Sequence, residues 1–169
     1  EKVDWSWRHN ALGAVQAIIR ESALADLIVL SAPNQNYQPD IARAFIGEIA
    51  LMAAAPVLTV PLDLEEFDVS GPVLAAWNGS LEATRTIRSN IGLLQKGSEV
   101  HLVSVGQAML RSFDAAESKA YFALLGLDVE VSDIAREGST TESLLQKAAE
   151  IGASYILLGA YGHSRFREA

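Results

Sequence analysis

Short runs of mainly apolar residues recur along this chain, and they alternate with segments that carry an apolar residue every three or four positions. The runs cover residues 27–30, 57–60, 73–77, 100–105 and 155–158. A run of this length without polar alternation is typical of a parallel strand buried on both faces. The three-to-four spacing between the runs is typical of amphipathic helices. This order predicts an α/β fold with an open, mostly parallel, doubly wound sheet and right-handed crossovers.

Capping signals place helices between these strands. Pro39 suits the first turn of a helix, and Ser80 is in position to cap another. Ser139 and Glu142 have the spacing of a capping box. The helix after Ser80 is expected to end at Gly97 and to bury four apolar residues: Ala83, Ile87, Ile91 and Leu94. Residues 128–132 alternate between polar and apolar, which predicts an edge strand with one wet face.

The first residues of the chain carry local signals of their own. Asn10 is in position to cap a helix whose apolar side begins with Leu12 and Val15. Trp5 and Trp7 are two positions apart, which would put both side chains on one face of a strand. We therefore expect the two tryptophans to pack.

The middle of the chain divides it into two halves. Residues 63–71 are acidic and turn-prone, and we interpret them as a linker. Residues 25–32 resemble residues 153–160, and each segment follows a helical pattern, which suggests a duplicated unit. We interpret residues 1–62 as the C-terminal part of a first domain. Residues 72–169 then form a second domain that lacks its last helix and strand, so the chain is expected to be a fragment or a gapped chain.

Composition excludes several classes of function. The chain has 13 basic and 21 acidic side chains, and its net charge of -8 disfavours a broad nucleic-acid-binding face. It has no cysteine, so disulfides, thiolate zinc sites and cysteine nucleophiles are excluded. No apolar stretch approaches the roughly 20 residues of a spanning helix, so no membrane partner is expected. His9, His101 and His163 do not share metal-ligand spacing, and no metal site is expected.

Two segments stand where a parallel sheet places its ligands, at the carboxyl ends of strands. One covers residues 76–80, and the other covers residues 159–165. Gly159 and Gly162 would let backbone amides approach a phosphate, and Arg165 adds positive charge. On the spacing alone, a glycine-permitted turn is the simpler interpretation.

The order of these segments resembles the universal stress protein family. The resemblance rests on residues 73–80 and on residues 153–165, and it covers residues 72–169. Residues 11–62 look like the second half of another such domain, so the parent chain resembles a tandem universal stress protein. The resemblance implies a five-stranded fold related to adenine-nucleotide-binding domains. It also implies a cytoplasmic role in stress response and pairing through last strands, as a homodimer or between tandem domains.

The resemblance also implies a nucleotide site for ATP or AMP, with Mg²⁺ if ATP is bound. By correspondence, Ala76 and Val105 would line the adenine pocket, with Trp77 as a bulky neighbour. Asn78 stands where the family usually has aspartate, and it keeps hydrogen-bonding capacity without the charge. The phosphate loop would contain five residues of the last segment: Gly159, Gly162, His163, Ser164 and Arg165. The third glycine of the family's pattern would fall after Ala169.

Three functional hypotheses remain open at this point. The first is a stress protein that responds to an adenine nucleotide. The second is a domain of the same fold that binds no nucleotide and acts by dimerisation or partner binding, which Asn78 and the incomplete phosphate loop favour. The third is a slow nucleotide hydrolase. It ranks last because the sequence shows no general base or metal constellation, so we expect no catalytic residues.

Overall fold

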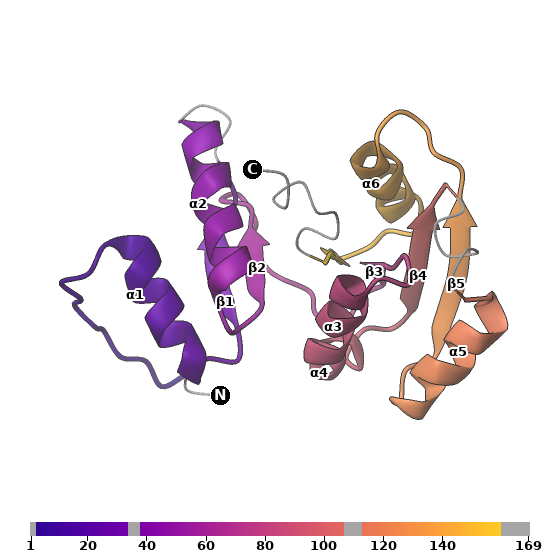
Figure 1. The fold of residues 1–169 in the computed structure, drawn as a ribbon, viewed down its shortest axis with the longest axis horizontal. Helices are drawn as coiled ribbons and strands as arrows, with labels where there is room; N and C mark the ends of the chain where they lie inside the picture. The colour runs from indigo at the N-terminus through magenta and orange to yellow at the C-terminus, as the bar shows by residue number, and fades with distance from the viewer. Residues whose placement is uncertain (1–2, 34–37, 107–112, 160–169) are drawn as a thin grey trace. The chain divides into compact units, whose positions relative to one another are not determined.

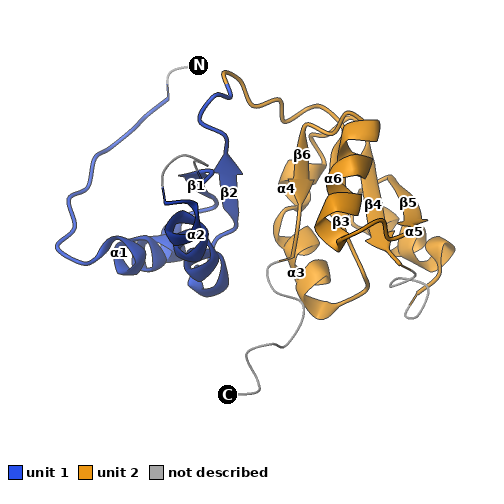
Figure 2. Cartoon of the chain, turned by 90° about the horizontal axis from the view of Figure 1, so that it is seen from above, with its two compact units in different colours: residues 1–64 blue, residues 65–169 orange. Residues whose placement is uncertain are grey.

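The computed structural model of the chain describes residues 3–33, 38–106 and 113–159 (Figure 1). These residues form two compact units, residues 1–64 and residues 65–169, which Figure 2 colours separately. Each unit has its own sheet. In the described ranges no helix is both long enough and apolar enough to span a membrane.

The sheet of the second unit confirms the predicted α/β fold. It contains four strands: β3 (Val73–Ala76), β4 (Val100–Val105), β5 (Val129–Ile134) and β6 (Tyr155–Leu157). Their order is β5-β4-β3-β6, and every neighbouring pair is parallel. The chain moves outward from β3 to β4 and β5, and then returns to the other side of β3 as β6. This reversal beside β3 creates the crevice in which open α/β sheets bind ligands.

Helices cover both faces of this sheet. They are α3 (Leu81–Ser89), α4 (Ile91–Leu94), α5 (Ala115–Leu124) and α6 (Thr140–Glu150). Because side chains alternate along a strand, Val73 and Ala75 share a core cluster with residues of α3, α4 and α5. Leu74 and Val103 pack on the opposite face against α6. The sheet is therefore buried on both faces, as the apolar runs predict.

The predicted caps fix the starts of these helices. The Ser80 hydroxyl accepts the Ala83 N–H at the start of α3. Ser139 and Glu142 form the predicted capping box of α6. The predicted single helix after Ser80 is interrupted at Asn90, whose side-chain amide donates to the Thr86 carbonyl at 2.8 Å. The interruption separates α3 from α4.

The first unit is a smaller arrangement of the same kind. It contains α1 (Ala14–Glu21), a short 3₁₀ helix η1 (Ser22–Leu24), β1 (Ile28–Ser31), α2 (Pro39–Met52) and β2 (Val57–Val60). β1 and β2 pair in parallel. The buried Ser22 hydroxyl accepts the Ala54 N–H and donates to the Ile19 carbonyl, which ties α1 to the end of α2. Pro39 occupies the first turn of α2, as predicted.

Two expectations for the N-terminal residues are wrong. Trp5 and Trp7 lie in a segment without secondary structure, and their side chains are 80% and 83% exposed. No strand forms in this described segment. Asn10 does not cap α1, which begins after Gly13; its carboxamide oxygen instead accepts the Leu12 N–H.

Part of the acidic stretch belongs to the packing of the second unit. The ring of Phe67 lies 5.5 Å from the ring of Tyr155, centroid to centroid. The Ser70 carbonyl accepts the Ser98 N–H at 2.8 Å. Hydrogen bonds from the hydroxyl and the N–H of Ser70 lower the pKa of Asp68 below its ordinary value. The contacts of Phe67 and Ser70 show that these residues belong to the second unit, which begins at residue 65.

Candidate functional site

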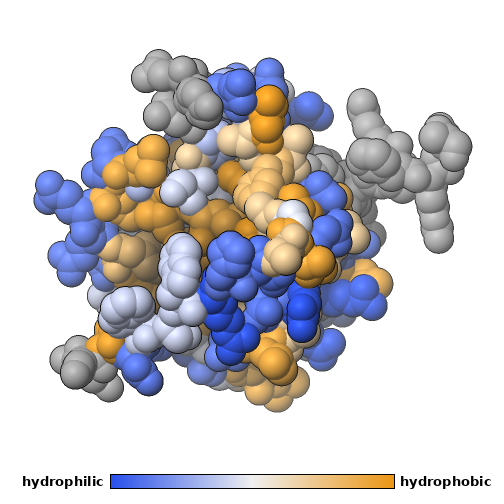
Figure 3. Space-filling view, turned by 90° about the vertical axis from the view of Figure 1, so that its left-hand side faces the viewer, coloured by the Kyte–Doolittle hydropathy of each residue, from blue (hydrophilic) through white to orange (hydrophobic). Residues whose placement is uncertain are grey.

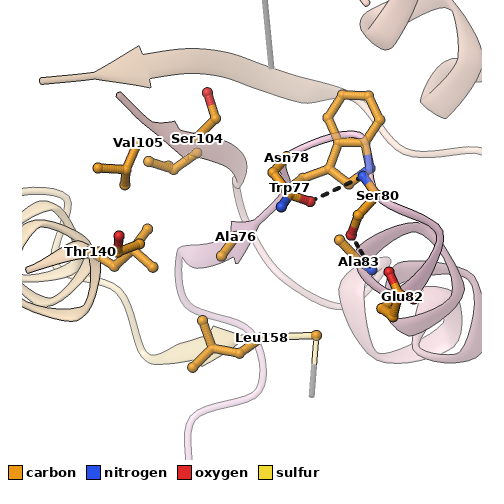
Figure 4. A pocket seen from close by; sticks show the side chains of 13 residues that line it. Ala76, Trp77, Asn78, Ser80, Glu82, Ala83, Ser104, Val105, Thr140 and Leu158 are labelled. Atoms are coloured by element: carbon orange, nitrogen blue, oxygen red, sulfur yellow. Dashed lines mark hydrogen bonds between the residues drawn. The ribbon is translucent and has the colours of Figure 1, made fainter. Parts of the chain in front are cut away.

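A cavity of about 300 Å³ opens where β3, β4 and β6 end (Figure 4). It lies at the reversal of strand order beside β3, the position that the sheet topology predicts for a ligand. Its lining comes from the turn after β3, the first turn of α3, the end of β4, the start of α6 and the exit of β6. The lining residues are Ala76, Trp77, Asn78, Ser80, Glu82, Ala83, Val103, Ser104, Val105, Thr140, Leu144, Leu158 and Gly159.

The turn after β3 is held by its own side chains. The Asn78 carboxamide oxygen accepts the Ser80 N–H at 3.0 Å, and Gly79 takes a φ of 75°. Because that oxygen is engaged, the amide group of Asn78 is left as a hydrogen-bond donor. An aspartate here would instead present a second acceptor and a charge. This turn then leads directly into the Ser80 cap of α3.

Trp77 lines the cavity, but its indole belongs to the core on the other face of the sheet. The indole N–H donates to the Thr84 hydroxyl at 3.1 Å. The ring stacks on Phe113 and meets Phe122 edge-on, with centroids 5.9 Å and 5.3 Å away. Figure 4 shows the indole pointing away from Ala76 and Leu158. Trp77 therefore supports the turn that carries Asn78.

The exit of β6 runs close to the first turn of α3. A Cβ atom added at Gly159 would lie 3.2 Å from both the backbone N and the Cα of Ala83. Only a residue without a side chain leaves this approach undisturbed. Gly159 therefore sets the spacing between β6 and α3, and so the width of the cavity on that side.

The polar groups around the cavity are mostly hydroxyls. Ser80 and Thr140 contribute two, and the Ser104 hydroxyl donates to the Asp133 carboxylate at 2.5 Å. Glu82, in the first turn of α3, is the one ionisable side chain among the described lining residues. The described lining therefore combines apolar side chains and hydroxyl groups with one negative charge, that of Glu82.

Groups with shifted pKa values lie outside this lining. Hydrogen bonding to Ser139, chiefly from its backbone N–H, lowers the pKa of Glu142. Burial raises the pKa of the Tyr155 hydroxyl, which donates to the Leu93 carbonyl. In the described ranges, no group of three or more His, Asp and Glu side chains could hold a metal ion.

The structure brings five of the predicted site residues together around the cavity: Ala76, Trp77, Asn78, Val105 and Gly159. The other four, Gly162, His163, Ser164 and Arg165, lie outside the described residues. Sequence reasoning missed Glu82, Ser104 and Thr140. The signal for Glu82 and Thr140 was their place just after the caps Ser80 and Ser139, because the starts of these helices flank the cavity.

His101 lies elsewhere. It is buried in β4 between two carboxylates, with Nε2 3.1 Å from Glu99 and Nδ1 3.4 Å from Glu130. Its role in the described fold is to join two neighbouring strands.

Comparison with known proteins supports the fold. No known family profile matches the chain, and no curated protein matches it. A solved structure does match: a universal stress protein from Archaeoglobus fulgidus, with a TM-score of 0.62 and 20% sequence identity. The match covers 85% of this chain but 53% of the archaeal chain, so the chain spans about half of that protein. The predicted resemblance to universal stress proteins is confirmed at the level of the fold.

Proposed function

We propose that the second unit binds an adenine nucleotide, ATP or AMP, and that the protein acts as a regulatory stress protein of the universal stress type. The observation that carries this proposal is the cavity of about 300 Å³ at the ends of β3, β4 and β6. Its volume falls at the lower end of the roughly 300–1,000 Å³ typical of small-molecule sites. The archaeal protein of similar fold is a universal stress protein.

The lining residues suit the parts of such a ligand. Ala76 and Val105 offer small apolar surfaces on which a planar base can lie. The free amide group of Asn78 can donate to a ring nitrogen or a ribose oxygen. The family resemblance would assign the phosphates to Gly162, His163, Ser164 and Arg165, which lie outside the described residues, and Mg²⁺ would accompany ATP.

The proposed activity is binding without turnover. In the described lining, the one carboxylate has no histidine or lysine beside it to share general acid and base roles. Regulation would then follow from a ligand-dependent change in pairing, either in a homodimer or between tandem domains. We place this role in the cytoplasm, as the resemblance implies.

Calorimetric titration with AMP, and with ATP in the presence of Mg²⁺, tests the proposal. Ala76→Phe fills the cavity from its floor and should weaken binding at least tenfold. Ala120→Phe is the matched control, because Ala120 is exposed on α5 and outside the lining. If neither ligand binds the parent chain, the partner-binding hypothesis replaces this one. Binding that Ala76→Phe leaves unchanged would place the nucleotide elsewhere.

A further inference from the structure

The charge of the cavity is unusual for a nucleotide site. Phosphates carry negative charge and are normally met by cations or free backbone amides. The described lining contains no lysine, arginine or histidine, and its one ionisable group is the carboxylate of Glu82. Glu82 is exposed and lines the cavity.

The start of α3 would otherwise attract an anion. Helix N-termini present unpaired N–H groups and a positive dipole end. Here the Ala83 N–H is taken by the Ser80 hydroxyl, and the Ser80 N–H is taken by Asn78. Glu82 then adds a full negative charge to the same turn, and the backbone of Gly159 lies against it. The negative charge of Glu82 therefore opposes the attraction of this helix end for phosphate.

We propose that Glu82 makes this cavity selective for weakly charged adenine compounds, with adenosine and AMP preferred over ATP. The inference rests on the proposed function of the same site. A neutral nucleoside meets the apolar surfaces and the Asn78 donor without opposing charge. Each added phosphate brings more negative charge into the field of Glu82, so the penalty grows along the series adenosine, AMP, ATP.

Replacing the carboxylate isolates this effect. Glu82→Gln keeps the length of the side chain and removes its charge. Calorimetric titrations of the full chain with adenosine, AMP and Mg²⁺-free ATP should show the smallest change in affinity for adenosine. Affinity for AMP should rise slightly, and affinity for ATP should rise about three- to tenfold at low salt. The gain should shrink at high salt, because the Debye length falls to roughly 3 Å at 1 M.

Asp128→Asn is the matched control. It removes the same charge from an exposed residue just before β5, at the opposite end of the strands. We expect it to leave the ranking of the three ligands unchanged. If it raises ATP affinity as much as Glu82→Gln does, the effect belongs to net charge and the inference fails.

Other outcomes separate this inference from the proposed function. An equal change for adenosine and ATP, or no change, would overturn the role of Glu82 while leaving nucleotide binding intact. A loss of ATP affinity measured with Mg²⁺ would also overturn it, because Glu82 would then be holding the metal. If adenosine, AMP and ATP all fail to bind the parent chain, the proposed function and this inference fail together.

Discussion

At the scale of single residues, Gly159 shows how the fold can depend on the absence of one side-chain atom. Its φ is not in the left-handed region, so the need for glycine comes from space and not from backbone conformation. The backbone of Ala83 and Glu82 occupies the volume that a side chain would need. The same close approach brings the exit of β6 to the edge of the cavity.

Gly159→Val should therefore destabilise the protein and widen the cavity. Overpacking against backbone costs about 1–3 kcal/mol, and AMP affinity should fall with it. Urea unfolding and calorimetry measure the two effects. Gly92→Ala in α4 is the control, because a Cβ atom there meets nothing within 4 Å. The control should be unchanged or more stable by about 0.5–1 kcal/mol. Equal stability of the two variants would contradict this account of Gly159.

At this scale the sequence predicted structure correctly where the interacting residues are close neighbours in the chain. Asn78 and Ser80 follow a strand and precede a helix, so their turn and cap could be predicted together. The direction of the Trp77 indole could not be predicted. It depends on Thr84, Phe113 and Phe122, which come from three places in the chain and meet only in the fold.

At the scale of elements, the apolar runs located the strands well because burial on both faces leaves a strong pattern. The predicted edge strand at 128–132 is β5, which lies at the edge of the described sheet and extends to Ile134. Asp133 in that extension accepts the Ser104 hydroxyl of β4. The break at Asn90 was missed because Ile91 and Leu94 continue the same buried face after it.

The capping box of α6 gives a pH prediction. The carboxylate of ionised Glu142 accepts the Ser139 N–H, and hydrogen bonding to Ser139 lowers the folded-state pKa of Glu142. Its contribution to stability is therefore present at neutral pH. It is lost as pH falls from the ordinary glutamate range near about 4.3 and then through the lowered pKa.

Glu142→Gln should be less stable than the parent chain at neutral pH, and the difference should shrink on acidification. Thermal unfolding between neutral and acidic pH measures it. Glu66→Gln removes the same charge from an exposed side chain that makes no hydrogen bond in the described ranges. A difference between Glu142→Gln and the parent that grows as pH falls would contradict the assignment.

At the scale of the whole molecule, the two units differ in how much they bury. The first unit fully encloses few described residues, namely Ser22, Ile49 and Ala55. Apolar residues of this unit reach its surface, among them Val29, Ile41 and Leu51, and Figure 3 shows apolar surface among the polar side chains. The second unit has two buried clusters around its sheet. The sequence predicted strands and helices in both halves. It could not predict how completely each sheet is buried, because that depends on which elements pack against it.

This difference predicts unequal protection from hydrogen exchange. Amides of β1 and β2 should exchange faster than those of β3 and β4, because local opening costs least where few apolar contacts are broken. Peptide-resolved exchange on the full chain measures both in one sample. Equal protection would show that the first unit is covered in solution by something outside the described residues.

The central claim is that an adenine compound enters the cavity at the carboxyl ends of β3, β4 and β6. An NMR titration of the ¹⁵N-labelled chain with AMP tests it most directly. We expect amide shifts to change at residues 76–80, 103–105 and 158–159, while amides at the opposite strand ends, near Val73, Val100 and Val129, stay in place. The absence of any shift, or shifts concentrated in residues 14–60, would contradict the claim.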